Sequence, residues 1–382
     1  MDSIDRVRSL LHGEPVDYVP INDFFWPETL RAWTWQGYPT VGADHELAGF
    51  IPFEESERQE RPISPNYYFG FDMNDGSHFQ DWFDVMPIVG FSRIIDENED
   101  WYIEENGAGA MHKYWKHKSG TPEHVHFAMT NRKVWEKEYR PLLLEVDRRR
   151  FNFGEIRREL GRGTRHRLFT YYDHLFLFEI LRQSLGDICL YESLLLEPGW
   201  ILDFNRVYTD FIVAHMRLLF QEVGKPDGVW VCEDLGYRNA LFMSPRTYEE
   251  LFFPFHKEYA DFLRSNGVVP LFHSCGYIEE MLPRMIAAGF SAIHPMEVKA
   301  GCDALRFAEK HRDELTFVGG LDVRVLEAGD KERIRVETAR LIKGMKSLGA
   351  RYIFGSDHSV TPRVSYDSYR CALDAYREHM MY

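Results

Sequence analysis

The sequence predicts an α/β barrel, and three observations support this fold class. Apolar strands alternate with amphipathic helices from about residue 165 onward, which indicates parallel βαβ units. Six such strands, with one at 18–23 and one near 67–72, make the eight of a closed (β/α)8 TIM barrel. No G-x-G-x-x-G turn, typical of a doubly wound open sheet, is present. We therefore expect residues 1–382 to form a single TIM-barrel domain.

The chain opens with a predicted helix. Ser3 is its expected cap, apolar residues recur at helical spacing as far as Leu11, and Gly13 and Pro15 end it. The strand at 18–23, YVPIND, follows directly, and the strand near 67–72 is read from YYFGFD.

A different pattern occupies residues 88–131 in the first half of the chain. Asn-Gly at 106–107 and Ser-Gly at 119–120 separate short aromatic and β-branched runs, which is typical of an antiparallel hairpin or meander. We expect this segment to be a β-rich insertion on the barrel that covers its mouth. Residues 132–167 are rich in Arg and Lys, and a solvated helix face explains them better than a binding patch does.

The second half repeats strand and helix regularly. The predicted strands are 167–172, 228–234, 267–276, 290–298, 315–322 and 350–359. The predicted helices are 175–222, broken near Glu197-Pro198-Gly199, and 245–265, 277–288, 302–312, 330–348 and 365–380.

Composition excludes some classes of protein. The formal net charge of −15 argues against nucleic acid and against an anionic membrane surface as partners. The five cysteines show no paired spacing, which favours a reducing compartment over a disulfide framework. The sequence shows neither a signal peptide nor an apolar run of membrane-spanning length. These features predict a cytoplasmic protein.

Chemically capable residues recur where the predicted strands end. They are Glu233, Asp234, His273, Ser274, Cys275, Glu297, Asp322, Asp357 and His358. In an α/β barrel the carboxyl ends of the strands line the mouth where active sites lie. A chain returning to solvent accounts for some of these residues, but less well for the His and Cys.

His273 and Cys275 form the most specific pair. Two residues apart on a strand, their side chains point to the same face. Alone, such a pair is better explained as a buried Cys beside a hydrogen-bonded His. Glu297 and His358 end two further strands at the same mouth, however, and imidazole, thiolate and carboxylate together suit Zn²⁺. We predict these four residues as metal ligands.

The remaining strand-end residues are candidates with structural alternatives. Tyr172 and His174 are predicted to line the pocket, or else to lie in the core. Glu233 and Asp234 diverge on a strand, so one is expected to face the pocket while the other holds a loop. Asp322 and Arg324 bind a polar substrate group or pair with each other. We assign catalytic roles to Glu233 and Asp322, and substrate binding to Tyr172, His174, Asp234 and Arg324.

Several segments resemble the uroporphyrinogen decarboxylase superfamily. They are LFHSCGYIEEML at 271–282, IHPMEVKAGCDALR at 293–306, FVGGLDVRVL at 317–326 and YIFGSDHSVTPRVSY at 352–366. RVRSLLHGEPVDYVPI at 6–21 and YYFGFDMND at 67–75 resemble it more loosely. The superfamily includes zinc methyltransferases that exchange methyl groups between corrinoid proteins and thiols, and its barrel is similar to that of cobalamin-independent methionine synthase.

The resemblance implies a metal site and one further catalytic residue. The methyltransferases bind zinc through an H-x-C pair, a Glu and a Cys at the last strand end; His273, Cys275 and Glu297 match, whereas the last segment reads GSDHS, with His358 as the replacement. Asp72 in YFGFD matches a catalytic Asp of the decarboxylases, with a helix cap as the alternative.

The predicted function is therefore a zinc-dependent methyltransferase. It would move a methyl group between a small thiol or methyl ether and a corrinoid, methylcobalamin, held by a partner protein; a homodimer is left open. Uroporphyrinogen decarboxylase ranks second, because the region equivalent to its arginine-rich motif holds only Arg31. A barrel that binds a ligand without catalysis ranks third.

Overall fold

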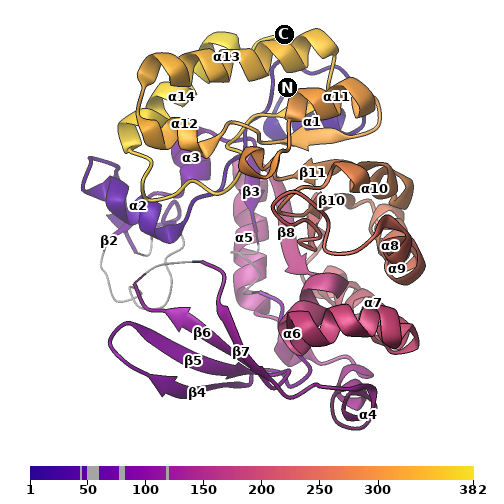
Figure 1. Cartoon of the computed structure of the whole chain (residues 1–382). Helices are drawn as coiled ribbons and strands as arrows, with labels where there is room; N and C mark the ends of the chain where they lie inside the picture. The colour runs from indigo at the N-terminus through magenta and orange to yellow at the C-terminus, as the bar shows by residue number, and fades with distance from the viewer. Residues whose placement is uncertain (44, 50–59, 77–81, 118–119) are drawn as a thin grey trace.

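A computed structural model describes residues 1–43, 45–49, 60–76, 82–117 and 120–382 (Figure 1). Its centre is a seven-stranded parallel sheet in the order β13-β12-β11-β10-β9-β8-β3. The strands are β3 (Met73–Asp75), β8 (Phe169–Leu175), β9 (Gly228–Cys232), β10 (Val269–His273), β11 (Ala292–His294), β12 (Thr316–Val318) and β13 (Tyr352–Ile353). Among the described residues, no helix is both long enough and apolar enough to span a membrane.

Residues 18–23 lie between the two edge strands of this sheet. Ile21 forms a parallel bridge with Phe354, beside β13, and its carbonyl accepts a 3.0 Å hydrogen bond from the Asp72 amide at the start of β3. Pro20 has no amide proton to donate, so a regular ladder cannot form here. The eighth predicted strand is thus present as an irregular segment of an α/β barrel fold.

The strand predicted near residues 67–72 is wrong. Its first residues belong to a short helix, α3 (Pro65–Phe69), and Gly70 ends that helix at φ 75°. Pro65 fits the first turn of a helix, where its missing amide proton is not needed. Strand β3 therefore begins only at Met73. The aromatic residues of this segment have high strand propensity, but they form a helix here because context outweighs propensity.

Helices pack around the sheet in the order expected of βα units. They are α1 (Ser3–Leu11), α2 (Pro27–Thr34), α5 (Phe153–His166), α6 (Leu177–Leu196), α7 (Pro198–Glu222), α8 (Pro245–Leu251), α9 (Phe253–Ser265), α10 (Leu282–Ala288), α11 (Ala304–His311), α12 (Val323–Ala328), α13 (Lys331–Leu348) and α14 (Tyr366–His379). The predicted break at Glu197 separates α6 from α7. Asp2, not Ser3, caps α1, because its carboxylate accepts from the Asp5 amide.

The antiparallel insertion is present. Strands β4 (Ser92–Glu97), β5 (Trp101–Asn106), β6 (Ala110–Trp115) and β7 (Glu123–Phe127) form a meander in sequence order. Both β6 and β7 contact α6, and the sheet lies away from α13 and α14 (Figure 1). The basic stretch that follows contains the short helix α4 (Arg132–Val134) before α5. A separate two-stranded sheet joins β1 (Thr40–Gly42) to β2 (Glu60–Pro62).

Alternate residues of each strand face two separate apolar clusters. One cluster joins inward residues of all seven strands to the apolar face of α1: Met73, Phe169, Tyr171, Trp230, Cys232, Leu271, Ala292, Val318 and Ile353, with Val7, Leu10 and Leu11. The other lies between the sheet and the helices and includes Tyr172, Val231 and Phe272. Because side chains alternate along a strand, His273 and His294 share the inward face with Leu271 and Ala292.

The same alternation corrects two pocket residues. Tyr172 and His174 point outward into the helix layer, where Tyr172 packs on Trp82 with ring centroids 4.8 Å apart. His174 Nε2 lies 2.7 Å from the Tyr259 hydroxyl. The structural alternative therefore holds for both, and the inward position at this level of β8 belongs to Tyr171.

His174 should make the stability of the fold dependent on pH. Burial lowers its pKa from 6.5 to about 4, so between these values the unfolded state binds a proton that the folded state excludes. Its contribution to stability is complete above pH 6.5 and is lost as the pH falls toward 4. At about pH 5 the loss should reach roughly 2 kcal/mol. Urea unfolding of His174→Gln should therefore show a smaller loss of stability on acidification than the unsubstituted protein, whereas His12→Gln, at an exposed site, should not differ from it.

Candidate metal centre

The parallel register aligns the strand ends that carry the candidate residues. His273, the last residue of β10, pairs with Cys232 on β9 and with His294 on β11. The chain continues from each of these positions into a loop at the carboxyl edge of the sheet. Asp234 and Cys275 each lie two residues beyond that level. Register alone therefore brings three neighbouring strand ends together.

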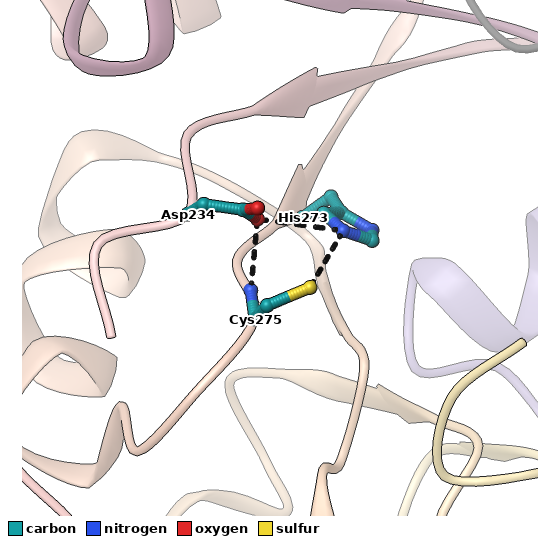
Figure 2. Close-up of side chains that lie close together, drawn as sticks. All are labelled: Asp234, His273 and Cys275. Atoms are coloured by element: carbon teal, nitrogen blue, oxygen red, sulfur yellow. Dashed lines mark hydrogen bonds and ion pairs between the residues drawn. The ribbon is translucent and has the colours of Figure 1, made fainter. Parts of the chain in front are cut away.

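Asp234, His273 and Cys275 converge at this edge (Figure 2). Their donor atoms lie within 4.8 Å of one another, close enough to share one metal ion. Cys275 Sγ is 3.4 Å from His273 Nε2, and His273 Nε2 is 3.6 Å from Asp234 Oδ1. The side chains of His273 and Asp234 keep 25% and 35% of their surface exposed, so the site remains open to ligands.

Asp234 reaches the site through an unusual backbone conformation. Its φ is 35°, one of two positive values among the non-glycine residues that the structure describes, and such a conformation costs of order 1–3 kcal/mol. Its carboxylate accepts a 3.0 Å hydrogen bond from the Cys275 amide. The turn thus directs the Asp234 carboxylate toward the loop that carries Cys275. An extended backbone at Asp234 would not point its side chain there.

Two glycines allow the loops after β9 and β10 to touch. A Cβ on Gly236 would lie 2.5 Å from the Cys275 carbonyl oxygen, and one on Gly276 would lie 2.3 Å from the backbone of Gly236. The Tyr277 amide also donates to the Tyr237 carbonyl (2.8 Å). This backbone contact holds Asp234 and Cys275 in place against each other.

Glu297, a predicted ligand, is not one of the three converging donors. Its Oε2 accepts from the Gly276 amide (2.6 Å), and its Oε1 pairs with Lys299 Nζ (3.0 Å). Its carboxylate therefore anchors the loop that carries Cys275. Asp234, predicted to bind substrate, takes the place among the donors that the sequence assigned to Glu297.

His358 does approach the site, and His294 is a neighbour that the sequence analysis missed. His358 Nε2 lies 3.3 Å from Cys275 Sγ. His294 Nδ1 lies 2.9 Å from His273 Nδ1. His294 lies in the middle of the strand predicted at 290–298, and only the observed register shows that it ends β11 and faces inward beside His273.

Burial disfavours the charged forms of the ring and thiol groups at the site. Burial lowers the pKa of His273, against the opposing effect of Asp234 and Glu297. Burial also raises the pKa of the Cys275 thiol well above 9, and both carboxylates add to this rise. The pKa values of His294 and His358 are lowered chiefly by burial. A cation placed here would reverse the effect on the thiol, because a coordinating thiol is deprotonated.

Glu233, a predicted catalytic residue, serves as a structural anchor. It is fully buried, and its Oε2 accepts from the amides of Phe178 (2.7 Å) and Glu179 (3.1 Å) at the start of α6. Its other oxygen accepts from His256 Nε2. Glu233 and Asp234 thus diverge as predicted, but the residue that faces the site is Asp234.

Asp72 lies at the opposite end of the strands from His273. It precedes β3, is fully buried, and accepts hydrogen bonds from Ser3 Oγ (2.8 Å), Tyr18 Oη (3.0 Å) and the Ile21 amide (3.0 Å). Arg6 Nη1 forms a 2.8 Å ion pair with it. With four donors around it, Asp72 ties α1 to the sheet and lies apart from the three converging donors.

Asp322 and Arg324 pair with each other, the structural alternative for these residues. Arg324 Nη2 lies 2.8 Å from Asp322 Oδ2, and the Asp322 side chain caps α12 through the Arg324 amide. The predicted catalytic role of Asp322 and the predicted substrate contact of Arg324 therefore find no support in the geometry.

A small cavity lies next to β3 and β8. Its volume is about 90 Å³, and its lining includes Asp23, Phe24, Asp75 and Tyr171. The ring of Phe24 lies 4.6 Å from that of His294, which in turn contacts His273. None of the three converging donors lines this cavity, and the contact of Phe24 with His294 is what links it to the metal centre.

Glu233→Gln should separate the structural role from the chemical one. The amide keeps the shape of the side chain but loses the charge that accepts from two helix amides and from His256. Hydrogen bonds to charged groups contribute about 1.5–3 kcal/mol, so the free energy of unfolding should fall by about 2–3 kcal/mol. Metal binding by the folded variant should stay unchanged. Chemical denaturation would measure the free energy of unfolding, and metal titration would measure metal binding. Glu250→Gln is the control: Glu250 belongs to an exposed ion pair, so its loss should change stability little.

The fold is similar to that of a solved structure along nearly the whole chain. A methyltransferase from Methanosarcina mazei superposes with a TM-score of 0.64 at 13% sequence identity, covering 99% of each chain. An α-amylase from Geobacillus thermoleovorans (10% identity, covering 60% of this chain and 56% of that chain) matches with a TM-score of only 0.34. A γ-CGTase from Alkalophilic bacillus clarkii (12% identity, covering 62% and 42%) gives the same score. Among curated proteins, no sequence matches.

The profile of the uroporphyrinogen decarboxylase (URO-D) family matches residues 205–379. This range contains β9 to β13, all three converging donors and the four segments on which the resemblance mainly rests. The whole-chain match at 13% identity supports the same fold. Residues 205–379 thus match the model of the family that the sequence motifs resemble.

Proposed function

We propose that this protein is a zinc-dependent methyltransferase that uses a small thiol or methyl ether. The observation that carries the proposal is the convergence of Asp234, His273 and Cys275 at the carboxyl edge of the parallel sheet. The fold shared with a methyltransferase agrees with it. The transfer partner in this proposal is a corrinoid held by a separate protein.

The donor set fits zinc by its chemistry. One imidazole nitrogen, one sulfur and one carboxylate oxygen are the ligand types of zinc sites, and three protein ligands leave the open position typical of catalytic ones. The charges also match, since a thiolate and a carboxylate together balance a divalent cation. When bound, zinc supplies a Lewis acid that stabilises a substrate thiolate or polarises an ether oxygen.

The residues of this chain contribute the orientation of the donors. Glu297 and the two contacting glycines position Cys275, and the turn at Asp234 aims its carboxylate at the same point. Phe24 and Tyr171 give the neighbouring cavity aromatic walls.

Two features of the cavity next to β3 and β8 disfavour it as a binding site for uroporphyrinogen. A cavity of about 90 Å³ is well below the roughly 300 Å³ at which pockets for drug-sized ligands begin. Its lining residues include one cation, Arg162, which pairs with Glu159 at 3.0 Å. A macrocycle with several carboxylates would find neither the volume nor the positive charge in this cavity.

Protein purified without added metal should contain about one zinc per chain, measured by elemental analysis. Cys275→Ser should weaken zinc binding by at least about 100-fold, because loss of an outer hydrogen-bond partner already costs 10–100-fold. Cys371→Ser is the matched control, since Cys371 is a buried cysteine on α14. Zinc content unaffected by Cys275→Ser would contradict the proposed site.

The two candidate reactions can be separated by direct assay. Incubation with reduced cobalamin as a surrogate acceptor and a panel of methyl ethers and methyl thioethers should produce methylcobalamin, detected by its absorbance. Asp234→Asn should abolish this product. Conversion of uroporphyrinogen to coproporphyrinogen at about 1 per second or faster would instead establish the decarboxylase reaction.

A further inference from the structure

A backbone hydrogen bond determines which ring nitrogen of His358 carries the proton, and the protonated nitrogen faces Cys275. The Ser359 amide donates a 2.8 Å hydrogen bond to His358 Nδ1. An amide can only donate, so Nδ1 must offer its lone pair. In a neutral imidazole the proton then resides on Nε2, the nitrogen that lies 3.3 Å from Cys275 Sγ.

His273 has the opposite arrangement available to it. Its Nε2 lies 3.4 Å from Cys275 Sγ and 3.6 Å from Asp234 Oδ1, while its Nδ1 faces His294 Nδ1 at 2.9 Å. A proton on Nδ1 of His273 can be donated to His294, which leaves Nε2 of His273 bare for a metal. Metal-binding histidines commonly donate their second ring nitrogen in this way.

The loop that carries His358 is held rigidly from several sides. Asp357 accepts from the amides of Val298 (2.9 Å) and Val323 (2.8 Å). Ser356 Oγ donates to the buried Asp23 carboxylate. Turning the His358 ring to present a bare Nε2 would set a protonated Nδ1 against the Ser359 amide, two donors facing each other, in a loop with little freedom to adjust.

We infer that His358 donates its Nε2 proton to the Cys275 sulfur and is not a metal ligand. The inference rests on the metal site proposed above and deepens it. The ion then has three protein ligands, Asp234, His273 and Cys275, and its fourth position stays open to substrate. The N–H donor draws charge from the coordinated sulfur, which keeps Cys275 a ligand while the substrate atom at the open position reacts.

Nitrogen NMR of the histidine rings tests this directly. In ¹⁵N-histidine-labelled protein, long-range ¹H–¹⁵N spectra distinguish the two neutral tautomers, and His358→Gln identifies the signals of His358 by their absence. We expect His358 in the Nε2–H form both without metal and with one equivalent of zinc, and His273 in the Nδ1–H form with zinc. A zinc-induced change of His358 to the Nδ1–H form would overturn the inference.

Cobalt substitution gives an independent readout. His358→Gln retains a side-chain N–H donor and should leave cobalt affinity and the sulfur-to-cobalt charge-transfer band nearly unchanged. His358→Leu removes the donor, so the band should shift to longer wavelength while affinity falls by no more than about 10–100-fold. A larger loss of affinity in both variants, with a changed ligand-field spectrum, would make His358 a ligand. Failure of the unsubstituted protein to bind zinc or cobalt would instead overturn the proposed metal site, and this inference with it.

Discussion

The register of β9, β10 and β11 is the constraint on which the candidate site depends. It sets His273 level with Cys232 and His294, so that the loops leaving these strands begin at one height. A shift of one residue in β10 would turn His273 outward and Phe272 inward, because side chains alternate along a strand. The apolar residues that face the two sides of the sheet therefore hold the chemical groups in register.

Carboxylates at this edge of the sheet serve two different purposes. Glu233, Glu297 and Asp357 accept hydrogen bonds from backbone amides of neighbouring elements, and in this way they fix helices and loops. Asp234 also accepts from an amide, but it remains partly exposed and is close to His273. In the proposed site the metal-binding role falls to Asp234, which stays open to a ligand, while its fully buried neighbour Glu233 holds the start of α6.

The site also concentrates features that oppose stability. Asp234 adopts a positive φ, and two loops pack backbone against backbone at Gly236 and Gly276. Buried histidines whose pKa is lowered lie beside a thiol whose pKa is raised. Such strain persists only where surrounding structure enforces it, and it is frequent at functional sites. Here hydrogen bonds to carboxylates hold the strained loops in place. Glu297 binds the Cys275 loop, and Asp357 and Asp23 bind the His358 loop.

The sequence by itself determined the α/β fold, the antiparallel insertion, and the meeting of His273 and Cys275 at a strand end, because alternation and turn residues are local signals. Tertiary structure decided the rest. Tyr172 and His174 lie in the helix layer because their face of β8 points outward. Asp72 is an anchor because it lies at the amino end of β3, beside α1. The choice between Asp234 and Glu297 depended on one backbone angle and on which amides each carboxylate meets. Those contacts join residues distant in the chain, so no local pattern records them.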